Sequence, residues 1–344
     1  MDSRIMCYWR NLQQSLFPKL EDELGPQTEK HGLVMVILDL VDPAKALRPS
    51  ASMGRPQACR VALACAFIAK AVLNFSTTEA LIDRLHCDKV LRRLCGFEPW
   101  KKLPSKGTFS NAFREFADSE LASKLHEVLV AKSYENRLVG HVSRDSTAIA
   151  AREAVDTSQK TKWKRKKGKK KRVRRQLKMT LSEMRQDLPQ AADLGRKSGY
   201  SWKGYKLHLD CGDGGIPLSC IVTSASLHDS QAAIYLEELT SQRVVSLYTL
   251  MDKAYDAKEI RQFVAQKNKV AIISPLKTQG QVEWLDPAQK RRLQERSTVE
   301  RVFSRLKDDF GTRHLRVRGH AKVTAHLMFG VLALTAEQLI RHFN

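Results

Sequence analysis

The chain has 344 residues, of which 42% are hydrophobic, and a formal net charge of +22; it is long enough for two or three domains with a buried core, and its charge predicts a nucleic-acid partner. Its seven cysteines include no Cys-x-x-Cys pair, which argues against a zinc ribbon and favours free thiols in a reducing cytosol. Residues 1–24 contain charges and no apolar signal segment, and the apolar stretch at 327–336 is ten residues long, too short to span a membrane.

Residues 56–136 are predicted to be helical. Residues 60–73 are rich in Ala, Leu, Val and Ile, and Thr77 is typical of a helix N-cap. A further helix is predicted to begin near Ser105, with three phenylalanines at i, i+4 and i+7 on one face: Phe109, Phe113 and Phe116. Two interpretations are open, a helical bundle with a phenylalanine core and a helix-turn-helix-like DNA-binding region built on the same helices.

The most basic segment is residues 160–175, which holds twelve Lys and Arg residues and no acidic residue. A block of like charges repels itself and is predicted to be disordered when free, whereas phosphate would bind it with little sequence preference. A solvated loop is the alternative. Trp163 and Trp202 lie beside lysines and are candidates for stacking on unpaired bases, with packing as an equal alternative. The predicted DNA-binding residues here are Lys164, Arg165, Lys166, Lys167, Lys169, Lys170, Lys171 and Arg172.

After residue 137 the pattern alternates between strands and helices, which predicts an α/β layered domain. The chain is therefore divided into a helical region, residues 1–136, and an α/β domain, residues 137–344, with a basic insert at about 157–197. An Asp-Gly-Gly sequence at 213–215 predicts a hairpin turn. Strands are predicted at 139–143, 205–210, 216–222, 244–251 and 270–273, and helices at 231–239, 257–266 and 297–309.

Three carboxylates are placed so that they could form one site. Asp145 and Asp252 each follow a predicted strand, and Glu300 lies on the helix predicted at 297–309. Ligands of open α/β sheets collect at the carboxyl ends of strands. Mg²⁺ prefers oxygen ligands, and two such ions about 4 Å apart stabilise both the attacking and the leaving oxygen of an in-line phosphoryl transfer. The sequence therefore predicts two-metal chemistry on nucleic acid.

The helix that carries Glu300 is amphipathic. Arg296, Glu300 and Lys307 lie along one flank of its apolar stripe, so the carboxylate is placed to ligate a metal and the two cations to hold DNA phosphate. A surface ion-pair row is the alternative, because helices commonly show such pairs. The apolar stripe consists of Val299, Val302, Phe303, Leu306 and Phe310.

Neighbouring polar residues compete for these roles. Asp256 lies one turn beyond Asp252 and is predicted to cap the next helix. Four others are predicted to be structural, the aspartates in a hairpin turn and the histidines in hydrogen bonds: Asp210, Asp213, His208 and His228.

In this order the residues resemble the DDE transposases of bacterial insertion sequences that carry a Tyr-x2-Arg-x3-Glu-x6-Lys signature around the third carboxylate. Arg296, Glu300 and Lys307 match that spacing, whereas Leu293 stands where the signature has Tyr. The resemblance covers about residues 139–330, and residues 56–116 resemble the helical amino-terminal region of such proteins. Further matching segments are 204–208 (Gly-Tyr-Lys-Leu-His), 227–230 (Leu-His-Asp-Ser), 252–256 (Asp-Lys-Ala-Tyr-Asp) and 318–319 (Arg-Gly).

The resemblance implies an RNase H-like catalytic domain preceded by a helical DNA-binding region, with Asp145, Asp252 and Glu300 as catalytic carboxylates and metal ligands. It implies two Mg²⁺ ions, for which Mn²⁺ is expected to substitute, and two DNA partners, the terminal inverted repeats and a target. A homodimer in the synaptic complex and a cytoplasmic, nucleoid-associated location in a bacterium are expected, with no membrane partner. Two alternatives stay open: a domesticated or inactive DNA-binding regulator, and a nuclease of the same fold that cuts without joining.

Overall fold

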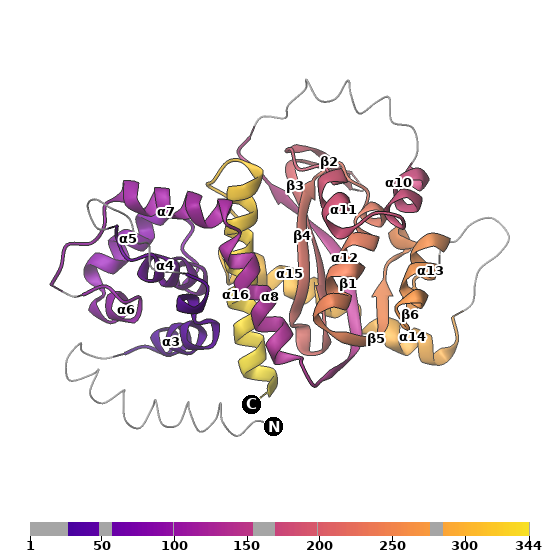
Figure 1. Ribbon diagram of the computed structural model, residues 1–344, viewed down its shortest axis with the longest axis horizontal. Coiled ribbons are helices and arrows are strands. Elements are labelled where there is room, and N and C mark those ends of the chain that lie inside the picture. Colours follow the sequence, from indigo (N-terminus) through magenta and orange to yellow (C-terminus); the bar gives the residue numbers. More distant parts are fainter. Residues whose placement is uncertain are drawn as a thin grey trace. The chain divides into compact units, whose positions relative to one another are not determined.

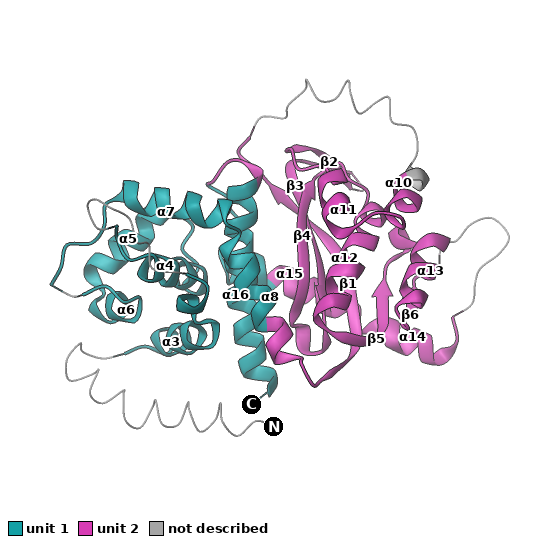
Figure 2. Cartoon of the chain, in the orientation of Figure 1, with its two compact units in different colours: residues 1–129, 305–316, 321–344 teal, residues 130–304, 317–320 magenta. Residues whose placement is uncertain are grey.

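The structure is a computed structural model that describes residues 27–47, 57–98, 100–153, 169–197, 199–275 and 285–343 (Figure 1). These residues form two compact units (Figure 2). Unit 1 takes its residues from 1–129, 305–316 and 321–344, and unit 2 takes its residues from 130–304 and 317–320. The predicted functional regions, 1–136 and 137–344, stay a prediction, and the compact units follow a different division of the chain.

Unit 1 is helical, and its helices begin where the sequence provides caps. The Thr77 hydroxyl accepts the Ala80 N–H at 3.0 Å before α5, and the Ser105 hydroxyl accepts the Thr108 N–H at 3.3 Å before α7. Each cap satisfies a backbone N–H that the first helical turn leaves unpaired. The helices are α3 (Glu29–Val41), α4 (Arg60–Val72), α5 (Thr78–Cys87), α6 (Lys89–Leu94), α7 (Lys106–Asp118) and α16 (His320–Phe343), and α8 (Leu121–Ser133) leads from unit 1 into unit 2.

A phenylalanine cluster forms part of the core of unit 1. The Phe67 ring of α4 lies 6.1 Å from the Phe109 ring and 5.0 Å from the Phe113 ring, measured between centroids. Phe329 of α16 lies 5.8 Å from Phe67, and Phe116 is fully buried. The predicted phenylalanine core is confirmed, whereas a DNA-binding role for the same helices stays a prediction.

Helix α16 is long and apolar enough to cross a membrane by length and composition alone. Most of it is buried within the protein, however, including Leu327, Val331 and Leu334, which are fully buried. The apolar stretch seen at 327–336 is therefore the middle of a longer core helix.

A six-stranded mixed sheet forms the centre of unit 2. Its order is β2-β3-β1-β5-β6, and β4 also pairs with β3. Strand β3 pairs antiparallel with β1, β2 and β4, whereas β5 pairs parallel with β1 and β6. The predicted hairpin turn at 213–215 joins β3 to β4, as expected. The strands are β1 (Leu138–Ala150), β2 (Asp193–Lys197), β3 (Tyr200–Cys211), β4 (Pro217–Ser224), β5 (Val245–Met251) and β6 (Val270–Ile273).

Helices lie against both faces of this sheet (Figure 1). On one face, four helices share a buried apolar cluster with β5 and β6: α10 (Lys169–Gln176), α11 (Leu181–Asp187), α12 (Ala233–Arg243) and α13 (Lys258–Gln266). The other face is lined by α14 (Pro287–Gln294) and α15 (Ser297–Asp308). There the Arg292 guanidinium lies 4.6 Å from the centre of the Tyr248 ring, and Val302 lies against Gly215.

The prediction of disorder for the basic segment is wrong for residues 169–175, which belong to α10. Val173 is buried in the apolar cluster, and the Gln176 amide donates to the Gln231 carbonyl at 3.0 Å. Arg172 pairs with Asp187 at 3.0 Å, so charge repulsion is offset by packing and by an acidic partner. Residues 160–168 lie outside the described residues.

Of the two tryptophans proposed to stack on bases, the structure describes Trp202. Trp202 is buried, and its indole N–H donates to the Tyr205 carbonyl at 3.0 Å. A buried ring cannot stack on a DNA base, so the packing alternative holds for this residue. Trp163 lies outside the described residues.

Candidate functional site

The register of β1 and β5 brings two candidate carboxylates to the same level. The last parallel pair is Ser143 with Leu250. Asp145 lies two residues after Ser143, and Asp252 lies two residues after Leu250, so the two carboxylates are level. Asp252 follows the end of β5 as predicted, but Asp145 lies inside β1, which continues to Ala150. The predicted end of this strand was wrong because β3 pairs with residues 143–150 of β1 after the parallel pairing ends.

Strand alternation places these two carboxylates on one face of the sheet. Arg144 and Met251 point toward α12, with a guanidinium-to-sulfur distance of 3.9 Å. Ser143 points the other way, and its hydroxyl donates to the Glu295 carbonyl at 3.2 Å. Since successive side chains of a strand alternate between faces, Asp145 lies on the α14–α15 face, and Asp252 continues the same face of β5.

Arg296 joins the first carboxylate to the third. It lies in the turn before α15, where Nη1 is 3.1 Å from Asp145 Oδ2 and Nη2 is 3.0 Å from Glu300 Oε1. The Asp145 side chain is 15% exposed and the Glu300 side chain 58% exposed. Arg296 therefore links a largely buried carboxylate on the sheet to an exposed carboxylate at the surface. A guanidinium offers its donors in a planar fork, which suits two carboxylates at once.

Burial raises the pKa of Asp145, and the nearby Asp252 carboxylate raises it further. The Ser146 N–H, Arg296 and Lys197 act in the opposite direction by stabilising the charged form. The Asp252 carboxylate accepts the Ala254 N–H at 2.8 Å. Two partly buried carboxylates that repel each other are a setting in which a nearby cation is stabilising.

Within the described ranges, no three His, Cys, Asp or Glu side chains are grouped closely enough to hold a metal ion. The donor set nevertheless fits hard divalent cations, because Asp145, Asp252 and Glu300 supply only oxygen ligands. The positive charge that lies between Asp145 and Glu300 is that of Arg296.

The structure describes only some of the other predicted DNA-binding residues. Lys307 lies two turns after Glu300 on α15 and is half-buried. Arg172 is in contact with Asp187 and Gln231. Lys169, Lys170 and Lys171 are in α10, where only their backbone is described, and Lys164, Arg165, Lys166 and Lys167 lie outside the described residues.

Two aspartates have roles other than those predicted. Asp256 does not cap α13, whose N-cap is Ala257, but pairs with Arg261 at 3.1 Å. Asp210 is not a turn residue; it is fully buried in β3 and accepts two hydrogen bonds from Arg144, each 2.7 Å long. Asp213 is in the hairpin turn as predicted, and it accepts the Gly140 N–H at 2.6 Å.

A second polar cluster near the site was not predicted. The Asp229 carboxylate accepts hydrogen bonds from the Ser146 hydroxyl and from Lys206 Nζ, both at 2.9 Å. Tyr255 is fully buried, and its hydroxyl has no hydrogen-bond partner among the described residues. Burial raises the pKa of Tyr255 well above its ordinary value, and the Asp229 and Asp145 charges raise it further. The segments 204–208, 227–230 and 252–256 contain three of these residues, so the resemblance carried the only sequence signal for them.

His208 makes the structural hydrogen bond that was predicted, with Nε2 2.9 Å from the Thr223 hydroxyl. Burial lowers the pKa of its imidazole from 6.5 to about 4. His228 likewise contacts the Ser230 hydroxyl, at 2.9 Å from Nδ1.

The lowered pKa of His208 predicts that the folded protein loses stability in acid. Its pKa is lower in the folded protein than in the unfolded chain, so the unfolded chain binds more protons between about pH 6.5 and 4, and stability falls as the pH falls through this window. The shift corresponds to roughly 3 kcal/mol. His208→Gln should therefore flatten the decline of the unfolding free energy between pH 7 and 4, measured by urea denaturation, whereas the exposed-residue control His86→Gln should not. If the unfolding free energy fell equally steeply with pH in wild type and His208→Gln, the lowered pKa of His208 would not be the cause of the acid sensitivity.

Two families of known proteins match parts of this chain. Residues 140–336 match the family described as Transposase DDE domain, and residues 22–115 match the family described as Transposase domain (DUF772). A search of curated proteins found no match. The first match covers more than half of the chain and contains Asp145, Asp252 and Glu300, so the protein belongs to the DDE transposases of insertion sequences.

Proposed function

We propose that this transposase cleaves DNA at the inverted-repeat ends of an insertion sequence and joins those ends to a target by two-metal phosphoryl transfer. The observation that carries the proposal is the placement of Asp145 and Asp252 at one level of adjacent strands, with Glu300 linked to Asp145 through Arg296. These three residues are the proposed catalytic carboxylates and metal ligands.

The sheet supports an RNase H-like assignment for residues 137–344. An antiparallel part, β4-β3-β1, continues into a parallel part, β1-β5-β6, with the two strand-borne carboxylates where the two parts meet. A ligand site at the carboxyl end of parallel strands is common in α/β sheets. Residues 1–136 are proposed to bind DNA, with a homodimer forming the synaptic complex.

The residues that surround the three carboxylates each have a definable task in this proposal. The Ser146 N–H and the Ala254 N–H hold the carboxylates of Asp145 and Asp252, at 2.7 and 2.8 Å. Arg296 keeps Glu300 directed toward the sheet. Two Mg²⁺ ions, or Mn²⁺ in their place, would be held by the three carboxylates and would stabilise the attacking and leaving oxygens.

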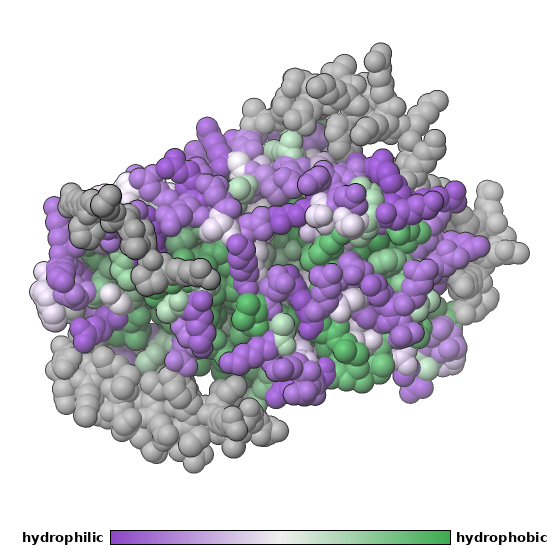
Figure 3. Space-filling model, in the orientation of Figure 1, coloured by the Kyte–Doolittle hydropathy of each residue, from purple (hydrophilic) through white to green (hydrophobic). Residues whose placement is uncertain are grey.

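The charge of the protein fits a DNA substrate. Hydrophilic residues cover most of the surface seen over α11 and α13 of unit 2 (Figure 3). The net charge of +22 favours polyanions, and phosphate contacts supply most of the affinity in non-specific DNA binding.

The deciding experiment uses DNA that carries the terminal inverted repeats flanking the gene. The full-length protein is incubated with labelled ends, target DNA and Mg²⁺ or Mn²⁺. Cleavage followed by joining is the expected result. Binding without cleavage would indicate a DNA-binding regulator, and cleavage without joining would indicate a nuclease of the same fold.

The basic segment before α10 predicts a steep salt dependence of DNA binding. Replacing its six cations with glutamine should weaken binding and flatten the plot of log affinity against log salt by roughly five units if all six contact phosphate, about 0.9 for each. Sequence preference should survive, because phosphate contacts carry no sequence information. An unchanged slope in filter-binding assays would identify the segment as a solvated loop. The six cations are Lys160, Lys162, Lys164, Arg165, Lys166 and Lys167.

Arg296→Lys should lower the cleavage rate by roughly tenfold, because an ammonium cannot span Asp145 and Glu300 as the guanidinium does, and a hydrogen bond to a charged group contributes about 1.5 kcal/mol or more. Arg301→Lys is the matched control on α15, since Arg301 is exposed and its guanidinium donates to the Thr298 hydroxyl at 2.9 Å.

Lys307→Ala should weaken both cleavage and the binding of the terminal nucleotides, measured with short end-labelled DNA. If Lys307→Ala and Arg296→Ala both matched wild type, α15 would not belong to the active site, and the role of Glu300 would be wrong as well.

A further inference from the structure

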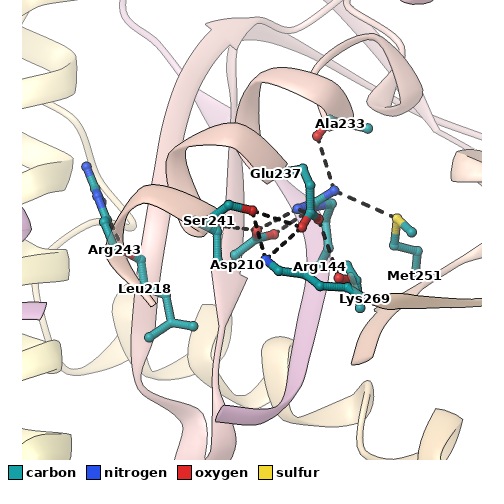
Figure 4. Close-up of polar contacts among 11 residues, drawn as sticks. Arg144, Asp210, Leu218, Ala233, Glu237, Ser241, Arg243, Met251 and Lys269 are labelled. Atoms are coloured by element: carbon teal, nitrogen blue, oxygen red, sulfur yellow. Dashed lines mark hydrogen bonds and ion pairs between the residues drawn. The ribbon is translucent and has the colours of Figure 1, made fainter. Parts of the chain in front are cut away.

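Arg144 is the largest fully buried side chain in the described part of the chain, and it immediately precedes Asp145. Its guanidinium connects three strands and a helix behind the candidate site (Figure 4). Nε and Nη2 donate to β3, Nη2 also donates to α12, and Nη1 contacts α12 and β5. The acceptors are the two oxygens of Asp210 at 2.7 Å each, Glu237 Oε2 at 2.8 Å, the Ala233 carbonyl at 3.1 Å and Met251 Sδ at 3.9 Å.

The network around Arg144 is balanced in charge. Lys269 Nζ is 2.9 Å from Glu237 Oε1, so two cations meet two carboxylates, and the Thr240 hydroxyl donates to Asp210 at 2.6 Å. A buried ion network is generally no more stabilising than apolar side chains of the same shape, because each charge loses its hydration. We therefore expect the network to contribute mainly by fixing the geometry of the elements that it joins.

That geometry is the spacing of the two carboxylate-bearing strands. Arg144 precedes Asp145, and its sulfur contact, Met251, precedes Asp252. Because side chains alternate between the faces of a sheet, the guanidinium holds β1 and β5 from one face at the level where both carboxylates project from the other. A planar group with five fixed donors restricts such a junction more than a flexible ammonium does.

We propose that Arg144 is a positioning residue of the active site, which fixes the separation of Asp145 and Asp252 from behind the sheet and thereby sets the affinity of the site for divalent cations. The inference rests on the proposed function, because it takes Asp145 and Asp252 to be metal ligands.

The test is Mn²⁺ binding to the full-length protein without DNA, measured from the electron paramagnetic resonance signal of unbound Mn²⁺. Arg144→Lys keeps the charge and loses the fork, so the dissociation constant for Mn²⁺ should rise about tenfold, since partners behind metal ligands typically contribute 10–100-fold to metal affinity. Lys269→Met is the matched control: it removes the other cation of the same network without touching β1, and it should lower the melting temperature while leaving Mn²⁺ affinity within about twofold of wild type.

Glu237→Gln is the milder second variant, because it keeps the shape of an Arg144 acceptor and removes its charge. It should weaken Mn²⁺ binding in the same direction by a smaller factor, and it decides the question alone if Arg144→Lys does not fold. Wild-type Mn²⁺ affinity in the folded variants, or equal weakening in Lys269→Met, would overturn the positioning role. Failure of the proposed function gives a different result: wild type binds no Mn²⁺, or Asp145→Ala binds it as well as wild type.

Discussion

Asp145→Ala and Asp252→Ala are each expected to lower the rate of DNA cleavage by roughly 10³-fold or more while leaving DNA binding near the wild-type level. A metal ion that stabilises the transition state contributes several kcal/mol, and each 1.4 kcal/mol corresponds to about tenfold in rate. The same ligands contribute little to the grip on phosphate, which depends on Lys and Arg. Glu300→Ala is expected to behave in the same way.

The measurement is single-turnover cleavage of labelled inverted-repeat DNA, with binding followed separately in Ca²⁺, which should support binding without chemistry because its looser coordination does not hold the in-line geometry. Asp256→Ala is the matched control for Asp252, since Asp256 lies four residues later and pairs with Arg261. Cleavage close to wild type in any of the three carboxylate variants would remove that residue from the site.

Asp210→Ala is expected to cost about 3–5 kcal/mol of unfolding free energy, the largest stability effect among these variants. Asp210 is fully buried and holds two of the Arg144 donors, so its removal leaves a buried guanidinium only partly compensated. In the low dielectric of the interior an unpaired charge is far more costly than it is at the surface.

Urea denaturation monitored by fluorescence measures this cost, and Asp308→Ala provides the control. Asp308 pairs with Arg313, but both side chains are about half exposed, so this substitution should cost about 1 kcal/mol or less. A loss of less than about 1 kcal/mol in Asp210→Ala would mean that Glu237 alone satisfies Arg144.

Local signals in the sequence were sufficient for most elements. Thr77 caps its helix as predicted, a helix begins at the predicted place near Ser105, and the hairpin at 213–215 forms between β3 and β4. Caps and tight turns depend on a few adjacent residues, so the amino-acid types are enough to place them. The strand predicted at 270–273 has the same bounds in the structure, Val270–Ile273.

Predictions failed where a partner distant in the chain decides the outcome. The polar sequence after Ser143 indicated the end of a strand, but β3 provides a second edge that extends β1 to Ala150. Asp210 was assigned to a turn because Asp is common in turns, whereas Arg144, 66 residues away, holds it inside the protein. Residues 169–175 form a helix because Val173 finds an apolar cluster to join.

The sequence alone determined the candidate carboxylates, their order, the amphipathic helix of Glu300 and the resemblance to DDE transposases, since these depend on residue identity and spacing. Only the tertiary structure decided that Asp145 and Asp252 lie level on one face, that Arg296 bridges Asp145 and Glu300, and that the Arg144 guanidinium lies 3.9 Å from the Met251 sulfur on the opposite face. The physical reason is that strand register and the pairing of buried charges are set by contacts and desolvation across the whole domain, which no local pattern of residues encodes.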